Sequence, residues 1–256
     1  MRFLRYDPDG NLVFEAFAVS GNTSLEPYAV LSHTWGKEQD EVTYRDILDG
    51  TASSKPGFKK IEFCAKQAAL DNVTYFWVDT CCINKSDGVE VQEAINSMFR
   101  WYQGSSKCYV YLSDVNNGHA NAGYWERSFR SSKWFTRGWT LQELIAPSTV
   151  DFFSSEGEWL GDKHGLKQQI YEITKVDPNA LLGKKPLDQF ELEERWSWSK
   201  GRRTAREEDA VYCLFGIFGT HMPLIYGEGY VNARERIQES LGRHTNLTAS
   251  ECCPRL

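Results

Sequence analysis

Short apolar runs alternate with amphipathic helical segments between residues 28 and 153. Four of these runs are rich in aromatic and β-branched residues and have the length of buried strands: 28–32, 75–79, 108–112 and 149–153. Residues 58–70 and 89–102 instead repeat apolar side chains at three- and four-residue steps, and Asp87 is a suitable N-cap for the second helix. Strands that alternate with helices predict an α/β fold, a parallel sheet covered by helices on both faces.

Polar and aromatic residues follow two of the predicted strands. Ser32, His33 and Trp35 come at the end of the first, and Asp79 ends the second. In parallel sheets the ligand crevice lies at the carboxyl ends of the strands. Ser32 either binds a ligand there or satisfies the strand-end backbone, and Asp79 is either a second acid or an acceptor for the amides of its own turn. Trp35 either belongs to the core or stacks on a ligand ring.

The segment 134–147 places Glu143 four residues after Trp139 on a predicted short helix, so the two side chains share a face. Apolar residues surround the pair, and a carboxylate among aromatic rings is unfavourable unless it pairs with another group or has a functional role. Glu143 therefore either pairs with Arg137 or caps a backbone group, or it is catalytic. Trp139, like Trp35, either belongs to the core or stacks on a ligand. The topology predicts that Ser32, Asp79 and Glu143 face one crevice.

The remainder of the chain has a mostly helical pattern. One helix is marked by apolar residues between 166 and 173, and another is expected to run from Glu207 through Ala210 and Leu214 to Ile217. A chain of 256 residues with 41% hydrophobic residues can bury a full core as one large domain. We expect an α/β core over residues 1–160, a helical part of the same domain over 161–244, and a loose tail over 245–256.

Charge and cysteine usage limit the partners and the compartment. A net charge of −6 and a pI near 5.5 argue against nucleic acid as a partner, and the short basic cluster 200–206 is expected to be a solvated loop. No apolar run has the length of a membrane helix, and the N-terminus lacks the apolar core of a signal peptide. Seven cysteines without a CxxC motif fit free thiols in a reducing compartment. A cytoplasmic protein is expected.

Other chemistries have weaker support in the sequence. His33 and either Cys81 or Cys82 lie at neighbouring strand ends and form a candidate thiol–imidazole pair, but nothing visible lowers the pKa of either thiol. The remaining histidines are scattered without ligand spacing, which argues against a zinc site. Glycine fingerprints of phosphate loops and dinucleotide-binding folds are absent. We therefore expect neither a metal nor a resident cofactor.

Four blocks of the sequence resemble the fungal heterokaryon incompatibility domain. They are YAVLSHTWG at 28–36, FWVDTCCIN at 76–84, INSMFRWY at 95–102 and GWTLQELIAP at 138–147. The resemblance runs from Met1 to about Leu241 and includes RWSW at 195–198 and PLIYGEG at 223–229. Proteins of this family trigger programmed cell death when genetically different hyphae fuse. The resemblance therefore implies a cell-death effector of fungal non-self recognition.

This family has been likened to TIR domains, which have a flavodoxin-like parallel sheet. In NAD-cleaving TIR domains a glutamate four residues after a tryptophan is catalytic, and the resemblance gives that role to Glu143. This chain has Cys81, Cys82 and Asp87-Gly88 where a TIR domain often has a Pro-Gly loop, and it is much longer than a TIR domain.

The chemistry that the resemblance implies is cleavage of the nicotinamide–ribose bond of NAD, with NAD as substrate. One carboxylate can stabilise the oxocarbenium-like transition state, because nicotinamide is already a good leaving group. Glu143 would face the developing cation while Trp35 or Trp139 packs against a ring and Arg137 contacts phosphate. Ser32, His33 and Asp79 complete the predicted substrate-binding set.

A second class of function is a non-enzymatic death-signalling module that self-associates and recruits partners. Both interpretations predict self-association, so oligomerisation alone does not separate them. A regulatory receptor attached to the domain is a further expected partner.

Overall fold

The computed structural model describes residues 1–16, 26–116 and 124–251. Within these ranges seven strands form one sheet in the order β2-β1-β4-β3-β5-β6-β7. The strands are β1 (Arg2–Tyr6), β2 (Leu12–Ala16), β3 (Tyr28–His33), β4 (Tyr75–Trp77), β5 (Lys107–Tyr111), β6 (Val150–Phe153) and β7 (Trp159–Asp162).

The sheet is mixed, which corrects the expectation of a parallel sheet. The central strands β4, β3, β5 and β6 are parallel, but β1 is antiparallel to both β2 and β4, and β7 is antiparallel to β6. Short turns cause the antiparallel pairing of β1 with β2 and of β6 with β7, because a strand that returns through a few residues pairs antiparallel with its predecessor. The turn between β1 and β2 is held by Asp7, whose side chain accepts hydrogen bonds from the backbone of Asp9 and Asn11.

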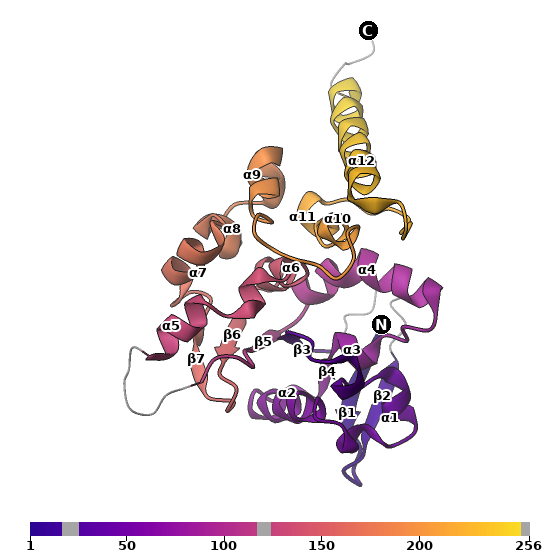
Figure 1. Ribbon diagram of the computed structural model, residues 1–256, viewed down its shortest axis with the longest axis vertical. Helices are drawn as coiled ribbons and strands as arrows, with labels where there is room; N and C mark the ends of the chain where they lie inside the picture. Colours follow the sequence, from indigo (N-terminus) through magenta and orange to yellow (C-terminus); the bar gives the residue numbers. More distant parts are fainter. Residues whose placement is uncertain (17–25, 117–123, 252–256) are drawn as a thin grey trace.

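Helices cover both faces of the sheet (Figure 1). In Figure 1, α2 (Phe58–Leu70) lies below the sheet, and α4 (Gly88–Gln103) and α6 (Thr140–Ile145) lie above it. The predicted helices 58–70 and 89–102 are confirmed, and Asp87 caps α4 by accepting from the backbone of Val89 and Glu90. The remaining helices of this part are α1 (Tyr44–Leu48), α3 (Asp79–Cys82) and α5 (Tyr124–Arg130).

The C-terminal part is helical, as predicted, but its helices are shorter than expected. The segment expected as one helix from Glu207 to Ile217 is two helices, α10 (Asp209–Tyr212) and α11 (Phe215–Phe218). The others are α7 (Lys167–Thr174), α8 (Pro178–Leu181), α9 (Leu192–Ser197) and α12 (Gly229–Glu251). Helix α12 continues past residue 245, where a loose tail was expected, and residues 252–256 lie outside the described residues. No helix in the described ranges has both the length and the apolar character needed to cross a membrane.

Helix α11 joins the C-terminal part to the α/β core by packing directly on α4. A Cβ atom placed on Gly216 would lie 2.0 Å from the Cβ of Phe99, so only glycine permits this approach. The core itself is continuous from the sheet into the C-terminal helices and includes Trp77, Trp134, Trp198 and Tyr212, all almost fully buried.

We expect Gly216→Ala to lower the free energy of unfolding by about 1–3 kcal/mol, because the added methyl group forces α11 away from α4. Urea unfolding followed by tryptophan fluorescence measures this loss. Gly242→Ala is the matched control, since that glycine lies in α12 with nothing within 4 Å of an added Cβ, and alanine is the better helix former. Equal stability of the two variants would contradict the close packing of α11 on α4.

Candidate functional site

A cavity of about 680 Å³ lies where the carboxyl ends of β3 and β4 meet α4, the start of α6 and residues 203–206 of the C-terminal part. Its volume falls within the roughly 300–1,000 Å³ of natural small-ligand sites. Every predicted site residue except Ser32 lines it: His33, Trp35, Asp79, Arg137, Trp139 and Glu143. The prediction that Ser32, Asp79 and Glu143 face one crevice therefore holds for Asp79 and Glu143 but not for Ser32.

Ser32 lies beneath the cavity and holds Glu143 in place. Its side chain is fully buried, so it has no surface for a ligand. The Ser32 hydroxyl donates to Oε2 of Glu143 at 2.5 Å and accepts from Nε1 of Trp134 at 2.8 Å. This chain of hydrogen bonds fixes one oxygen of the carboxyl group and leaves Oε1 to the cavity, where no hydrogen bond within the described residues engages it.

The environment of Glu143 favours its neutral form. Burial raises the pKa of Glu143 to about 8, and the negative charge of Asp79 adds to the effect, although the Ser32 hydrogen bond and the charges of Arg137 and Arg202 oppose it. Because Oε2 accepts from Ser32, the oxygen available to carry the proton of the neutral acid is Oε1. The alternative that Glu143 pairs with Arg137 is not observed, since no ion pair joins them in the described structure.

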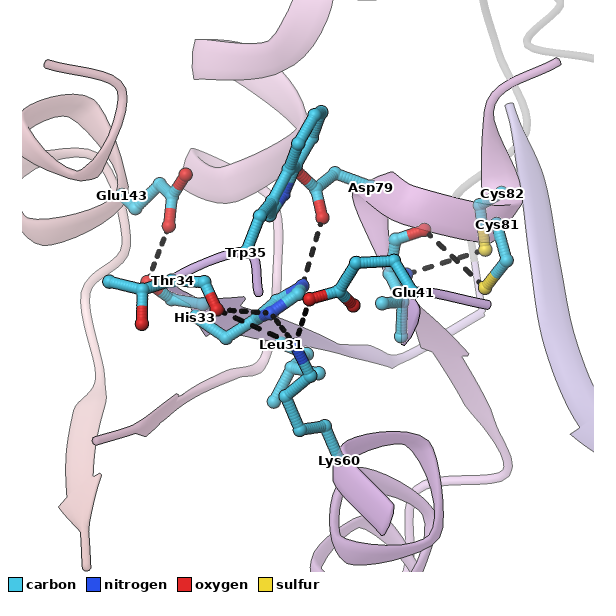
Figure 2. A network of polar contacts seen from close by, with 12 residues as sticks. Leu31, His33, Thr34, Trp35, Glu41, Lys60, Asp79, Cys81, Cys82 and Glu143 are labelled. Atoms are coloured by element: carbon cyan, nitrogen blue, oxygen red, sulfur yellow. Dashed lines mark hydrogen bonds and ion pairs between the residues drawn. The ribbon is translucent and has the colours of Figure 1, made fainter. Parts of the chain in front are cut away.

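A chain of charged groups runs from α2 to the cavity floor (Figure 2). Nζ of Lys60 lies 2.5 Å from Oε1 of Glu41 and 3.0 Å from Nδ1 of His33. Nε2 of His33 lies 3.2 Å from Oδ1 of Asp79, and Nδ1 also lies 3.3 Å from the carbonyl oxygen of Thr34. These contacts on both ring nitrogens fix the positions of His33 and Asp79.

Asp79 also holds Trp35, whose Nε1 donates to Oδ2 at 2.8 Å. Burial by itself raises the pKa of Asp79, but the hydrogen bond and the positive charge of His33, the charge of Lys85 and the hydrogen bond from Trp35 bring it below its ordinary value. Asp79 is thus a fixed anion within the cavity. The ring of Trp35 is 42% exposed, and Nζ of Lys85 lies 3.5 Å from its centre.

The basic segment expected as a solvated loop is a wall of the cavity instead. The backbone of Arg203 accepts from the amide of Gly138 at 2.9 Å and donates to the carbonyl of Thr136 at 2.6 Å. Nη1 of Arg202 donates to the carbonyl of Arg137 at 2.8 Å. These bonds attach the C-terminal part to the segment that carries Glu143. A Cβ on Gly138 would lie 2.4 Å from Cγ2 of Thr204. The segments around residues 138 and 204 can therefore approach this closely only because residue 138 is a glycine.

The thiol–imidazole pair is not formed. Both nitrogens of His33 face Lys60 and Asp79, and the thiols of Cys81 and Cys82 are buried against the backbone of Val78. Burial raises the pKa of the Cys81 thiol.

Sequence reasoning missed three charged residues that contact the site residues but lie outside the predicted site: Glu41, Lys60 and Lys85. Lys60 lies on what reads in the sequence as the solvated face of a helix, and no local pattern distinguishes it from its neighbour Lys59.

Comparison with known proteins identifies the family. Residues 28–127 match the model of the heterokaryon incompatibility protein (HET) family. Over 252 residues the chain is 51% identical to the vegetative incompatibility protein HET-E-1 of Podospora anserina, an alignment that covers 97% of this chain. The chain spans 18% of the length of that relative. No solved structure gives a significant match. The residues that match the family model include β3, β4 and β5 and the Trp35 and Asp79 segments of the cavity, and the chain belongs to the heterokaryon incompatibility (HET) family.

Proposed function

We propose that this protein is a cell-death effector of fungal vegetative incompatibility and that it acts by cleaving NAD at the bond between nicotinamide and ribose. The observation that carries the proposal is the placement of Glu143, which presents one unengaged carboxyl oxygen to a ligand-sized cavity while Ser32 holds the other. The relative HET-E-1 is named as a vegetative incompatibility protein, which supports the biological role.

A TIR-like core is part of this proposal. The four parallel strands lie in the order β4-β3-β5-β6, so the direction of winding reverses at β3. In doubly wound sheets a ligand binds at the carboxyl ends of the strands beside such a reversal. The end of β3 supplies His33 and Trp35 to the cavity, and Trp139 and Glu143 enter it from the neighbouring α6 region. The reversal of winding at β3 and the entry of Trp139 and Glu143 beside it are both expected of an NAD-cleaving TIR domain.

In the proposed reaction the bond between the nicotinamide nitrogen and the ribose breaks, and nicotinamide leaves with the bonding electron pair. The ribose carbon gains positive charge, which the ionised Glu143 stabilises from Oε1. Water then adds to that carbon and releases a proton, which gives ADP-ribose. Trp35 and Trp139 offer rings to pack against the substrate, His33 and Asp79 line the ribose end, and Arg137 contacts phosphate.

The alternative is a module that kills through self-association and recruitment of partners or a regulatory receptor, without turnover. Such a module has no need for an unengaged carboxyl oxygen in a cavity, so the structure favours the enzymatic proposal. Self-association is compatible with both functions.

We expect Glu143→Gln to reduce nicotinamide release from NAD by at least about 100-fold, because the amide cannot offset the charge of the transition state. The variant keeps the fold, since the amide oxygen still accepts from Ser32. Chromatographic detection of nicotinamide measures the effect, and cell killing on expression in a fungal host should be lost in parallel.

Glu207→Gln is the matched control, because Glu207 is exposed on the segment next to the cavity without lining it. A wild-type protein that kills cells but releases no nicotinamide, with Glu143→Gln equally toxic, would contradict the enzymatic proposal and favour the recruitment module.

The raised pKa of Glu143 predicts a pH-dependent stability difference between wild type and Glu143→Gln. Between the ordinary value of 4.5 and the folded value of about 8, the unfolded chain loses this proton and the folded protein keeps it. The folded state then binds more protons, so wild-type stability falls with rising pH by up to about 1.4 kcal/mol per pH unit relative to the variant. Urea unfolding of both proteins from pH 5 to pH 8 measures the difference. A constant difference across this range would show that Glu143 is ionised in the empty cavity.

A further inference from the structure

Two arginine side chains lie next to each other on one wall of the cavity. Arg137 and Arg203 are partners in an isolated parallel β-bridge, and both line the cavity. Residues that face each other across a bridge place their side chains on the same side, where like charges repel. A bridge that places two arginine side chains on the same side of a cavity wall is therefore unfavourable unless an anion lies between them.

No carboxylate of the described residues fills that role. Neither Arg137 nor Arg203 takes part in an ion pair within the described residues, and the same is true of Arg206 and Lys85, which line the same cavity. The guanidinium of Arg206 lies over the ring of Tyr226 at 4.0 Å. Elsewhere in the described structure several arginines are paired with acids, as Arg130 is with Glu126 and Glu172.

The acids of the cavity have their hydrogen bonds with other groups and not with these cations. Asp79 accepts from His33 and Trp35, and Asp209 accepts from the hydroxyl of Tyr226 at 3.1 Å. Glu143 is held by Ser32 in surroundings that favour its neutral form. At neutral pH the cations therefore exceed the anions on the wall. In a chain with a net charge of −6, such a concentration of positive charge marks a site for an anionic ligand.

We propose that Arg137, Arg203 and Arg206 form a diphosphate-binding subsite and that the ligand of this cavity is a nucleotide carrying a diphosphate. Two arginine side chains on the same side of a bridge can offer two donor forks, which suit two linked phosphate groups better than one. The inference rests on the proposed function only for the nicotinamide end of the ligand, and it gives the C-terminal part a direct role in binding. Glu143 and Arg137 come from the first part of the chain, whereas Arg203 and Arg206 come from the second, so the ligand bridges both.

The frame of the subsite is rigid, whereas the Arg203 side chain can be changed without loss of the fold. Its backbone makes the two hydrogen bonds to Thr136 and Gly138, but its guanidinium is exposed and makes no hydrogen bond to the described residues. Arg203→Gln therefore keeps the bridge and removes the charge. Arg127→Gln is the matched control, since Arg127 is also exposed but lies on α5 and does not line the cavity.

The test is calorimetric titration of the wild-type chain, Arg203→Gln and Arg127→Gln with ADP-ribose, ADP, AMP and inorganic pyrophosphate. None of these probes contains the bond that the proposed reaction cleaves, so binding is measured apart from turnover. We expect ADP-ribose and ADP to bind the wild type at least about tenfold more tightly than AMP, and Arg203→Gln to remove most of that advantage. Arg127→Gln should bind like wild type, and the affinity for ADP should fall with added salt.

The different probes distinguish an NAD-like ligand from other nucleoside diphosphates, and they test the diphosphate subsite separately from NAD cleavage. Tighter binding of ADP-ribose than of ADP supports an NAD-like ligand, and equal binding supports the subsite with nucleoside diphosphates in general. Loss of ADP-ribose binding in Arg203→Gln without any nicotinamide release from wild type would retain the subsite and reject NAD cleavage. Nicotinamide release with an unchanged KM in Arg203→Gln, or equal affinity for AMP and ADP, would overturn the subsite and retain the cleavage.

Discussion

Glu143 keeps its position because a buried hydrogen-bond chain from Trp134 through Ser32 ends on its carboxyl group. The chain joins the centre of the sheet to α6, so the catalytic candidate is attached to the most buried strand of the protein. The carboxyl end of α6 is anchored as well, because the buried Nζ of Lys163 donates to the carbonyls of Leu144 and Pro147. Burial lowers the pKa of Lys163 to about 8. A short helix of six residues would be marginal by itself, and these contacts fix it at both ends.

The cavity exists because the C-terminal part is attached to the same segment from the other side. The backbone of Arg203 pairs with residues 136–138 through one β-bridge, and α11 packs on α4 at Gly216. The α/β core supplies the acids and aromatic rings, and the added part supplies arginines. This division explains why the sequence resemblance continues well beyond the sheet: a HET domain truncated after β7 would keep Glu143 but lose one wall of its cavity.

The sequence was sufficient for features that depend on local periodicity and on strand order. The helices at 58–70 and 88–103 and the meeting of Asp79 with Glu143 followed from apolar spacing and from the common direction of parallel strands. The antiparallel strands β1, β2 and β7 were missed because each is only four or five residues long, although both hairpin turns contain a glycine with positive φ, Gly10 and Gly157. The roles of Lys60 and Arg203 were missed because their partners, His33 and Arg137, lie far away in the sequence. Each of the two residues occupies a position that the sequence pattern predicts to be exposed, and a cation at such a position is usually solvated.

The fixed charge of Asp79 links the shape of the cavity to the chemistry proposed for it. Burial and the charge of Asp79 together outweigh the nearby arginines and favour the protonated form of Glu143, and a neutral acid is the less unfavourable group in an aromatic pocket. The oxidised nicotinamide ring carries a positive charge, so its entry beside Asp79 and Glu143 reverses the sign of the local field and favours the carboxylate. On the proposed mechanism the charge that stabilises the transition state would thus appear chiefly when the cationic substrate is bound. A neutral, reduced nicotinamide lacks that charge and would leave Glu143 protonated, so the electrostatics of the cavity would themselves select the oxidised dinucleotide.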